Sequence, residues 1–152
     1  MAHLKIGDAA PDVTFIGPDN EQAPLSLFVG KENVVIAFYT AAFTDGCEVE
    51  MRYFQSKLTE FQRLNTQVIG SSTDAPDMQK GFAAHCGLAF PLLADTQKQE
   101  AAKAFGVYNE GYKSNDRVTF VIDRSGVIRH VVADEGNMQR HANDALEALK
   151  KL

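Results

Sequence analysis

The chain of 152 residues lacks the features typical of membrane-spanning, exported and nucleic-acid-binding proteins. It has no apolar run of the roughly 18–20 residues that a membrane-spanning helix needs, and its opening residues, MAHLKIGDAAPD, contain no apolar signal-peptide core. Basic residues are fewer than acidic ones, which gives a formal net charge of −5. This charge argues against nucleic acid or an acidic membrane surface as the main partner. We therefore expect a cytoplasmic protein that binds neither a membrane nor nucleic acid.

Cysteine is also scarce, because the chain contains only Cys47 and Cys86. These two do not form a Cys-x-x-Cys pair, which argues against a thioredoxin-type disulfide reductase. In a chain without an export signal, they are more typical of chemistry or packing than of a structural disulfide. The four histidines show no metal-ligand spacing, and neither a phosphate-binding glycine motif nor a serine-nucleophile turn occurs. We therefore predict no metal and no organic cofactor.

What the chain does contain is the composition of an ordinary globular protein. Hydrophobic residues make up 45% of it and charged residues 23%, both typical of a soluble domain. Its length suffices for one sizeable core. No internal repeat, low-complexity segment or linker interrupts it, so we predict a single domain over residues 1–152.

The most informative stretch is 33–61, which reads as strand, sharp turn, cysteine and helix. Val34–Phe38 is an apolar, β-branched run typical of a strand buried on both faces. After the turn, apolar residues recur at steps of four and three from Cys47 to Phe61, which predicts one amphipathic helix. Cys47 then lies in the first helical turn, where unpaired N–H groups and the helix dipole favour an anion such as a thiolate. Cys47 is a candidate nucleophile, and its structural alternative is a small buried hydrophobe.

The remaining segments alternate between strand and helix patterns. We predict strands or extended pieces over 6–18, 66–72, 90–95, 117–123 and 126–134, and helices over 77–86, 97–105 and 138–152. Segment 21–28 fits either a short strand or a single helical turn, and the last two strands read as a hairpin. This order predicts an α/β three-layer sandwich.

The segment FYTAAFTDGCEVE, residues 38–50, resembles the active-site segment of peroxiredoxins, whose pattern is Pro-x-x-x-Thr-x-x-Cys. Four further landmarks are in register with that family, namely GDAAPD (7–12), FPLLAD (90–95), AFGVYNE (104–110) and RVTFVIDRSG (117–126). The resemblance covers the whole chain and is closest to the AhpE-like one-cysteine group. It implies a thioredoxin-like fold, with helices on both faces of a central mixed β-sheet, and a homodimer.

The resemblance also implies a chemistry that the residues can support. A peroxiredoxin reduces hydrogen peroxide or a small organic hydroperoxide through a thiolate, here Cys47, which becomes a sulfenic acid. An external thiol of thioredoxin, glutaredoxin or low-molecular-weight type then recycles it. Arg117 matches the arginine that the family brings beside the cysteine, where a guanidinium stabilises both the thiolate and the charge that develops on the peroxide.

Two more residues have roles in this interpretation. The hydroxyl of Thr44 can accept a hydrogen bond from the incoming peroxide and donate one to the departing oxygen. By resemblance, Glu50 lies in the first helical turn and helps to position the arginine. The structural alternatives are a surface arginine at a strand end, a capping threonine and a solvated first-turn carboxylate.

The chain departs from the family pattern at two positions. Thr40 replaces the family's proline, and its side chain either bonds the thiolate or simply packs. Asp45 stands where the family often has glycine. An inward-pointing carboxylate there would oppose ionisation of the cysteine, whereas one that faces solvent or caps the helix would not. The aromatic residues Tyr39, Phe43 and Phe54 fit core or dimer contacts, or an apolar approach for alkyl hydroperoxides.

Cys86 decides the mechanistic subclass. As a resolving cysteine it would attack the Cys47 sulfenic acid, but a disulfide needs Cα atoms within ~7 Å, so two helices would have to rearrange. As a structural residue it ends a helix before its Gly87 cap. The alternatives to the one-cysteine peroxidase are therefore a two-cysteine mechanism with Cys86 resolving, a peroxide-sensing thiol-exchange protein with little turnover, and a peroxiredoxin-fold protein that acts through its surface.

Overall fold

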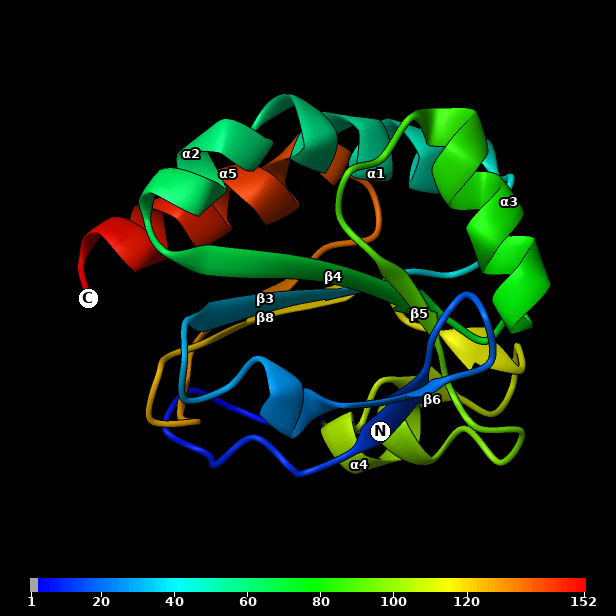
Figure 1. Ribbon diagram of the computed structural model, residues 1–152, viewed down its shortest axis with the longest axis horizontal. Helices are drawn as coiled ribbons and strands as arrows, with labels where there is room; N and C mark the ends of the chain where they lie inside the picture. The colour runs from blue at the N-terminus through cyan, green and yellow to red at the C-terminus, as the bar shows by residue number, and fades with distance from the viewer. Residues whose placement is uncertain (1–2) are drawn as a thin grey trace.

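A seven-stranded mixed sheet, in the order β2-β1-β5-β4-β3-β8-β9, forms the centre of the computed structural model, which describes residues 3–152 (Figure 1). The strands of this sheet are β1 (Thr14–Ile16), β2 (Gln22–Pro24), β3 (Asn33–Phe38), β4 (Thr66–Ser72), β5 (Leu92–Ala94), β8 (Val118–Ile122) and β9 (Ile128–Ala133). Strands β3, β4 and β5 are parallel to one another, whereas β8 pairs antiparallel with both β3 and β9. The predicted mixed sheet is confirmed.

Helices cover both faces of this sheet (Figure 1). They are α1 (Asp45–Ser56), α2 (Leu58–Arg63), α3 (Pro76–Cys86), α4 (Glu100–Phe105), α5 (Met138–Lys150) and the 3-10 helix η1 (Leu25–Leu27). Helices α1, α2, α3 and α5 pack on one face, and α4 and η1 pack on the other. The three-layer α/β sandwich is confirmed. None of the helices formed by residues 3–152 has the length and apolar character that crossing a membrane requires.

Strand β3 lies inside the sheet and is buried on both faces, as its continuous apolar run predicts. Val35 and Ala37 join the core under α1 and α5, whereas Val34, Ile36 and Phe38 join the core under α4. Because successive side chains point to opposite faces, this one strand contributes to both cores. It therefore holds the turn that follows it rigidly in place.

The predicted helix over 47–61 is wrong as a single element, because it is divided at Lys57, which leaves α-helical geometry at φ −103° and ψ 4°. The spacing of apolar residues in the sequence gives no sign of the break at Lys57, because the buried side chains of α1 and α2 face the same core. Segment 21–28 contains both predicted alternatives, β2 followed by η1. The sequence pattern missed the small hairpin β6 (Tyr108–Asn109) and β7 (Ser114–Asn115).

Candidate active site

Cys47 is the third residue of α1, directly after the turn that leaves β3, as predicted. Its side chain is fully buried. The turn is held by Asp74, whose carboxylate accepts hydrogen bonds from the Ala42 N–H at 2.7 Å and from the Ser72 hydroxyl at 2.6 Å. Phe43 takes a left-handed backbone conformation in this turn, with φ 61°. The chain therefore fixes the cysteine where unpaired helix N–H groups favour an anion.

Arg117 meets this cysteine from a segment distant in the sequence. In the β3–β8 pair, Phe38 lies opposite Val118, so Arg117 lies beside the chain that follows β3. Its Nη1 donates to Cys47 Sγ at 3.3 Å and to Glu50 Oε1 at 2.7 Å. The three side chains are almost completely buried, and Arg117 is 6% exposed. One guanidinium nitrogen is thus shared between a sulfur and a carboxylate.

The protein environment shifts the ionisation of this group. Burial raises the pKa of Glu50 to about 7, although the neighbouring Arg117 opposes that rise. Burial tends to lower the pKa of Arg117, but the charges of Glu50 and Cys47 outweigh this effect and raise it. The guanidinium therefore remains a cation at every pH at which the protein is folded. Glu50 therefore gains or loses a proton near neutral pH.

The structure corrects two predictions about the site, namely the helical turn in which Glu50 lies and the exposure of Glu50 and Arg117. Glu50 is the sixth residue of α1 and so lies in the second helical turn, not the first. It is fully buried, which excludes the solvated carboxylate considered as its structural alternative. Arg117 likewise is not a surface arginine. Both side chains instead face inward, toward the region where α5 packs against α1 and β8.

The remaining predicted residues lie at the solvent side of the site. Thr44 is the N-cap of α1, but its hydroxyl donates to the Ala41 carbonyl at 2.8 Å and accepts no hydrogen bond from a helix N–H. Thr40 is half-buried and lines a cavity of about 380 Å³, which Glu135 also lines. Among residues 3–152, no hydrogen bond joins the Thr40 hydroxyl to Cys47. Asp45 is exposed, which places its carboxylate in solvent.

A further residue of the site is His141 of α5, which is fully buried behind Glu50 and was not predicted from the sequence. Its Nδ1 lies 2.8 Å from the Thr119 hydroxyl and 3.7 Å from Glu50 Oε2. Its Nε2 lies 2.7 Å from the carbonyl oxygen of Asp134. A signal for it does exist, since His141 occurs at helical spacing within the apolar face of the last helix.

Cys86 ends α3, and Gly87 follows it in the left-handed conformation with φ 66°, as expected of a helix cap. Burial raises the pKa of the Cys86 thiol, although the Arg52 cation opposes this rise. Glu48 of α1 binds both Arg52 at 3.0 Å and His85 at 2.9 Å, and Arg52 Nη1 donates to the Cys86 carbonyl at 3.4 Å. These contacts tie the end of α3 to α1. Both cysteines are free thiols in this structure.

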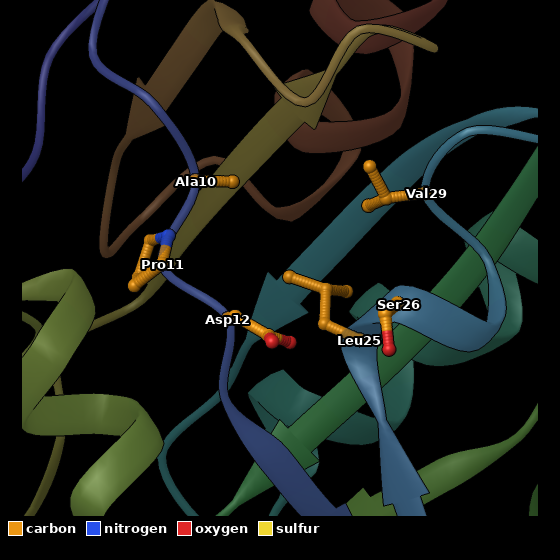
Figure 2. A pocket seen from close by; sticks show the side chains of 6 residues that line it. All are labelled: Ala10, Pro11, Asp12, Leu25, Ser26 and Val29. Carbon is orange, nitrogen blue, oxygen red and sulfur yellow. The ribbon is translucent and has the colours of Figure 1, made fainter.

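Among residues 3–152, a separate pocket lies away from the cysteine site. Figure 2 shows an apolar pocket lined by Pro11, Leu25 and Val29, among others. Leu25 belongs to the core on the opposite face of the sheet from Cys47, and this pocket has no thiol. Within residues 3–152, no cluster of three or more His, Cys, Asp or Glu side chains is placed to hold a metal ion.

Comparison with known proteins identifies the family. The family model described as the AhpC/TSA family matches residues 6–131. The chain belongs to this family. Alkyl hydroperoxide reductase E of Mycobacterium tuberculosis is 35% identical over 150 residues, which cover 96% of this chain and 98% of that protein. Peroxiredoxin Bcp of Escherichia coli is 34% identical over 157 residues, which cover 99% of each chain.

Solved structures agree with this assignment to the AhpC/TSA family. The crystal structure of peroxidoxin BcpB from Mycobacterium tuberculosis superposes with a TM-score of 0.91 at 33% identity and covers 99% of each chain. The predicted peroxiredoxin resemblance and thioredoxin-like fold are therefore confirmed. The homologues support a thiol-dependent peroxidase function, for which Cys47 is the candidate peroxidatic cysteine.

Proposed function

We propose that this peroxiredoxin reduces hydrogen peroxide and small organic hydroperoxides through Cys47, and that an external thiol recycles it. One observation carries the proposal, namely that Arg117 Nη1 donates to Cys47 Sγ at 3.3 Å within a buried site. A guanidinium in this position favours the thiolate, which is the nucleophilic form of cysteine. The names of the relatives, a hydroperoxide reductase and peroxiredoxins, support the same chemistry.

The proposed reaction has two stages. The Cys47 thiolate attacks one peroxide oxygen, the O–O bond breaks, and the other oxygen leaves as an alkoxide or hydroxide that takes up a proton. Cys47 becomes a sulfenic acid, and the peroxide is reduced to an alcohol or water. One reductant thiol then condenses with the sulfenic acid to give water and a mixed disulfide. A second thiol releases Cys47 as a thiol and the reductant as a disulfide.

We assign the surrounding residues by their contacts. Arg117 stabilises the thiolate and the charge that spreads along the S–O–O axis in the transition state. Glu50, which binds Arg117 at 2.7 Å, positions the guanidinium. The exposed Thr44 hydroxyl exchanges its bond to the Ala41 carbonyl for one to the peroxide. Thr40 packs at the entrance, in the place of the family's proline.

We propose an external reductant of thioredoxin, glutaredoxin or low-molecular-weight thiol type rather than Cys86. The contacts that tie Cys86 and His85 to α1 through Arg52 and Glu48 would have to break before the two sulfurs could meet. Resolution by Cys86 remains the alternative mechanism. It would require the end of α3 to unwind in the oxidised protein.

We further propose that residues 1–152 form one cytoplasmic domain that assembles as a homodimer. Exposed apolar side chains surround the cysteine element, with Phe43 from the turn, Val49 from α1 and Met78 from α3. A dimer interface would cover them. Light scattering should give twice the chain mass for the wild type and a lower mass for Phe43→Ser, whereas Tyr112→Ser, at another exposed aromatic residue, should leave the mass unchanged. Cell fractionation would test the compartment.

The test of the peroxidase proposal is the intact mass after one equivalent of hydrogen peroxide, with dimedone trapping and a count of free thiols. Wild type, Cys47→Ser and Cys86→Ser should be compared. A dimedone adduct on Cys47 with Cys86 still a free thiol supports the one-cysteine mechanism. Loss of both thiols, with an adduct only in Cys86→Ser, shows that Cys86 resolves. An unreactive Cys47 would refute the peroxidase proposal.

A further inference from the structure

Behind Arg117 lie two fully buried titratable side chains, Glu50 and His141, from α1 and α5. Glu50 Oε1 accepts from Arg117, but Glu50 Oε2 has no hydrogen-bond partner among residues 3–152. His141 Nδ1 lies 3.7 Å from this oxygen. A buried carboxylate oxygen without a partner is costly. A proton on Glu50 would remove the charge of this carboxyl group, and a proton on His141 would place a cation 3.7 Å from it; either would reduce that cost.

The contacts of His141 allow it to hold or release a proton without moving. A carbonyl oxygen can only accept, so the bond of 2.7 Å to the Asp134 carbonyl fixes a proton on Nε2. Nδ1 faces the hydroxyl of Thr119 at 2.8 Å. That hydroxyl donates to a neutral ring and accepts from a protonated one. Both charge states of His141 therefore keep both of their hydrogen bonds.

The charged groups that face this pair come from every element packed around it. Arg117 precedes β8, and its backbone N–H donates to Glu135 Oε2 at 2.7 Å. Burial and Arg117 lower the pKa of His141, whereas Asp134 and Glu135 oppose that shift. Burial and Glu135 raise the pKa of Glu50. His141 Nδ1 and Glu50 Oε2 lie 3.7 Å apart, which is close enough for the charge of one group to affect protonation of the other.

We propose that Glu50 and His141 hold one exchangeable proton between them, and that this proton sets how much of Cys47 is present as thiolate. Arg117 Nη1 is shared by Cys47 and Glu50, so the two anions compete for one cation. When the pair holds the proton, the charge of Arg117 is free to stabilise the thiolate. When the pair loses it, two anions share the guanidinium, and the thiolate is disfavoured. His141 is a positioning residue that acts through Glu50 and Arg117.

This inference rests on the proposed role of Cys47, but it can be tested without peroxide. The rate of Cys47 alkylation by iodoacetamide near pH 7 reports the thiolate fraction directly. All variants are made in Cys86→Ser, so that one thiol remains. His141→Gln keeps a donor toward the Asp134 carbonyl but cannot hold a second proton. Glu50→Gln keeps an acceptor for Arg117 and mimics the protonated carboxyl group permanently.

The two substitutions should have opposite effects. His141→Gln should slow alkylation by about threefold to tenfold, which corresponds to a change of about half to one unit in a pKa. Glu50→Gln should react at least as fast as the parent. His130→Gln, at a histidine of the neighbouring strand β9, is the matched control and should leave the rate unchanged. If His141 only packs, both site variants slow together, or His141→Gln has no effect. Either result overturns the inference, provided that circular dichroism shows folded protein.

A second measurement leaves Glu50 and His141 unchanged, so its result does not depend on whether variants at these two positions fold. The ring resonances of His141 can be followed by NMR against pH in the parent and in Cys47→Ser. If the proton on the pair favours the Cys47 thiolate, the thiolate must favour that proton to the same extent. Removal of the thiolate should therefore move the midpoint of the His141 titration to lower pH by about one unit. An unchanged midpoint would contradict the inference. The proposed peroxidase function fails separately, if alkylation proceeds as expected but peroxide does not oxidise Cys47.

Discussion

Replacing Glu50 with glutamine should remove a large part of the pH dependence of folding stability. The side chain is fully buried, and its pKa in the folded protein is raised from the ordinary 4.5 to about 7. Each unit of such a difference corresponds to about 1.4 kcal/mol. The buried carboxylate therefore lowers the free energy of unfolding by about 3 kcal/mol above neutral pH, relative to acid.

The sign of this effect follows from proton binding. Between pH 4.5 and about 7, Glu50 is ionised in the unfolded chain but still protonated in the folded protein. The folded state therefore binds more protons, and stability falls as pH rises through this window. The stability that comes from keeping Glu50 protonated is fully present below the pKa of Glu50 in the unfolded chain. It is lost above the pKa of Glu50 in the folded protein. Glu50→Gln mimics the protonated form at every pH, so it should match the wild type in acid and exceed its stability at pH 8.

Urea unfolding of both proteins at several pH values between 4.5 and 8 measures the effect. His141 is present in both proteins, so the comparison measures the titration of Glu50 together with its effect on His141. Glu48→Gln on the same helix is the control, since hydrogen bonds from Arg52 and His85 lower the pKa of Glu48 and give the opposite sign. If the stability difference between Glu50→Gln and wild type is the same at pH 4.5 and pH 8, the reasoning about this buried carboxylate is wrong.

Three further predictions concern single side chains. Arg117→Leu should slow peroxide oxidation of Cys47 by about 100-fold or more, as loss of a transition-state donor does elsewhere, whereas Arg52→Leu should change the stopped-flow rate little. Thr44→Val should lower the same rate by about 10-fold to 150-fold, because one hydrogen bond to a charged group is worth about 1.5–3 kcal/mol. Thr44→Ser should restore most of the rate, and equal rates for the two variants would argue against a role for the hydroxyl. Phe82→Ala removes a fully buried ring of α3 and should lower the free energy of unfolding by about 3–5 kcal/mol in urea titrations, so a loss below about 1 kcal/mol would contradict the described packing.

The part of the site nearest in sequence was predictable because local patterns determine it. The change from a continuous apolar run to helical spacing locates the turn between β3 and α1, and with it Cys47. The end of α3 at Cys86 was equally visible, since Gly87 supplies the left-handed cap. These features depend on residues within one or two helical turns of each other.

Some contacts join elements that lie far apart in the sequence. These contacts could be predicted only from the family resemblance, and some could not be predicted at all. Arg117 reaches Cys47 because β8 pairs with β3, and no local pattern carries that register. The burial of Glu50 depends on α5, which packs on α1 from the other end of the chain. The helical spacing of His141 was visible in the sequence, but its place in the site was not, because its partners Thr119 and Glu50 come from two other elements.

Very short elements were missed for a different reason. Strands β6 and β7 have two residues each, which is too few for an alternating pattern to be detected. The break at Lys57 left the apolar spacing intact, so the pattern continued across it. Packing on a common core determines this spacing, and it does not report hydrogen bonding along the backbone.

The central claim is that Cys47, under the charge of Arg117, is the residue that reacts with peroxide. Stopped-flow oxidation of the reduced protein by hydrogen peroxide at pH 7, with Cys47→Ser and free cysteine as references, tests it most directly. We predict that the wild type reacts orders of magnitude faster than free cysteine and that Cys47→Ser, which still contains Cys86, loses the fast phase entirely. A wild-type rate equal to that of free cysteine, or a fast phase that survives in Cys47→Ser, would contradict the account.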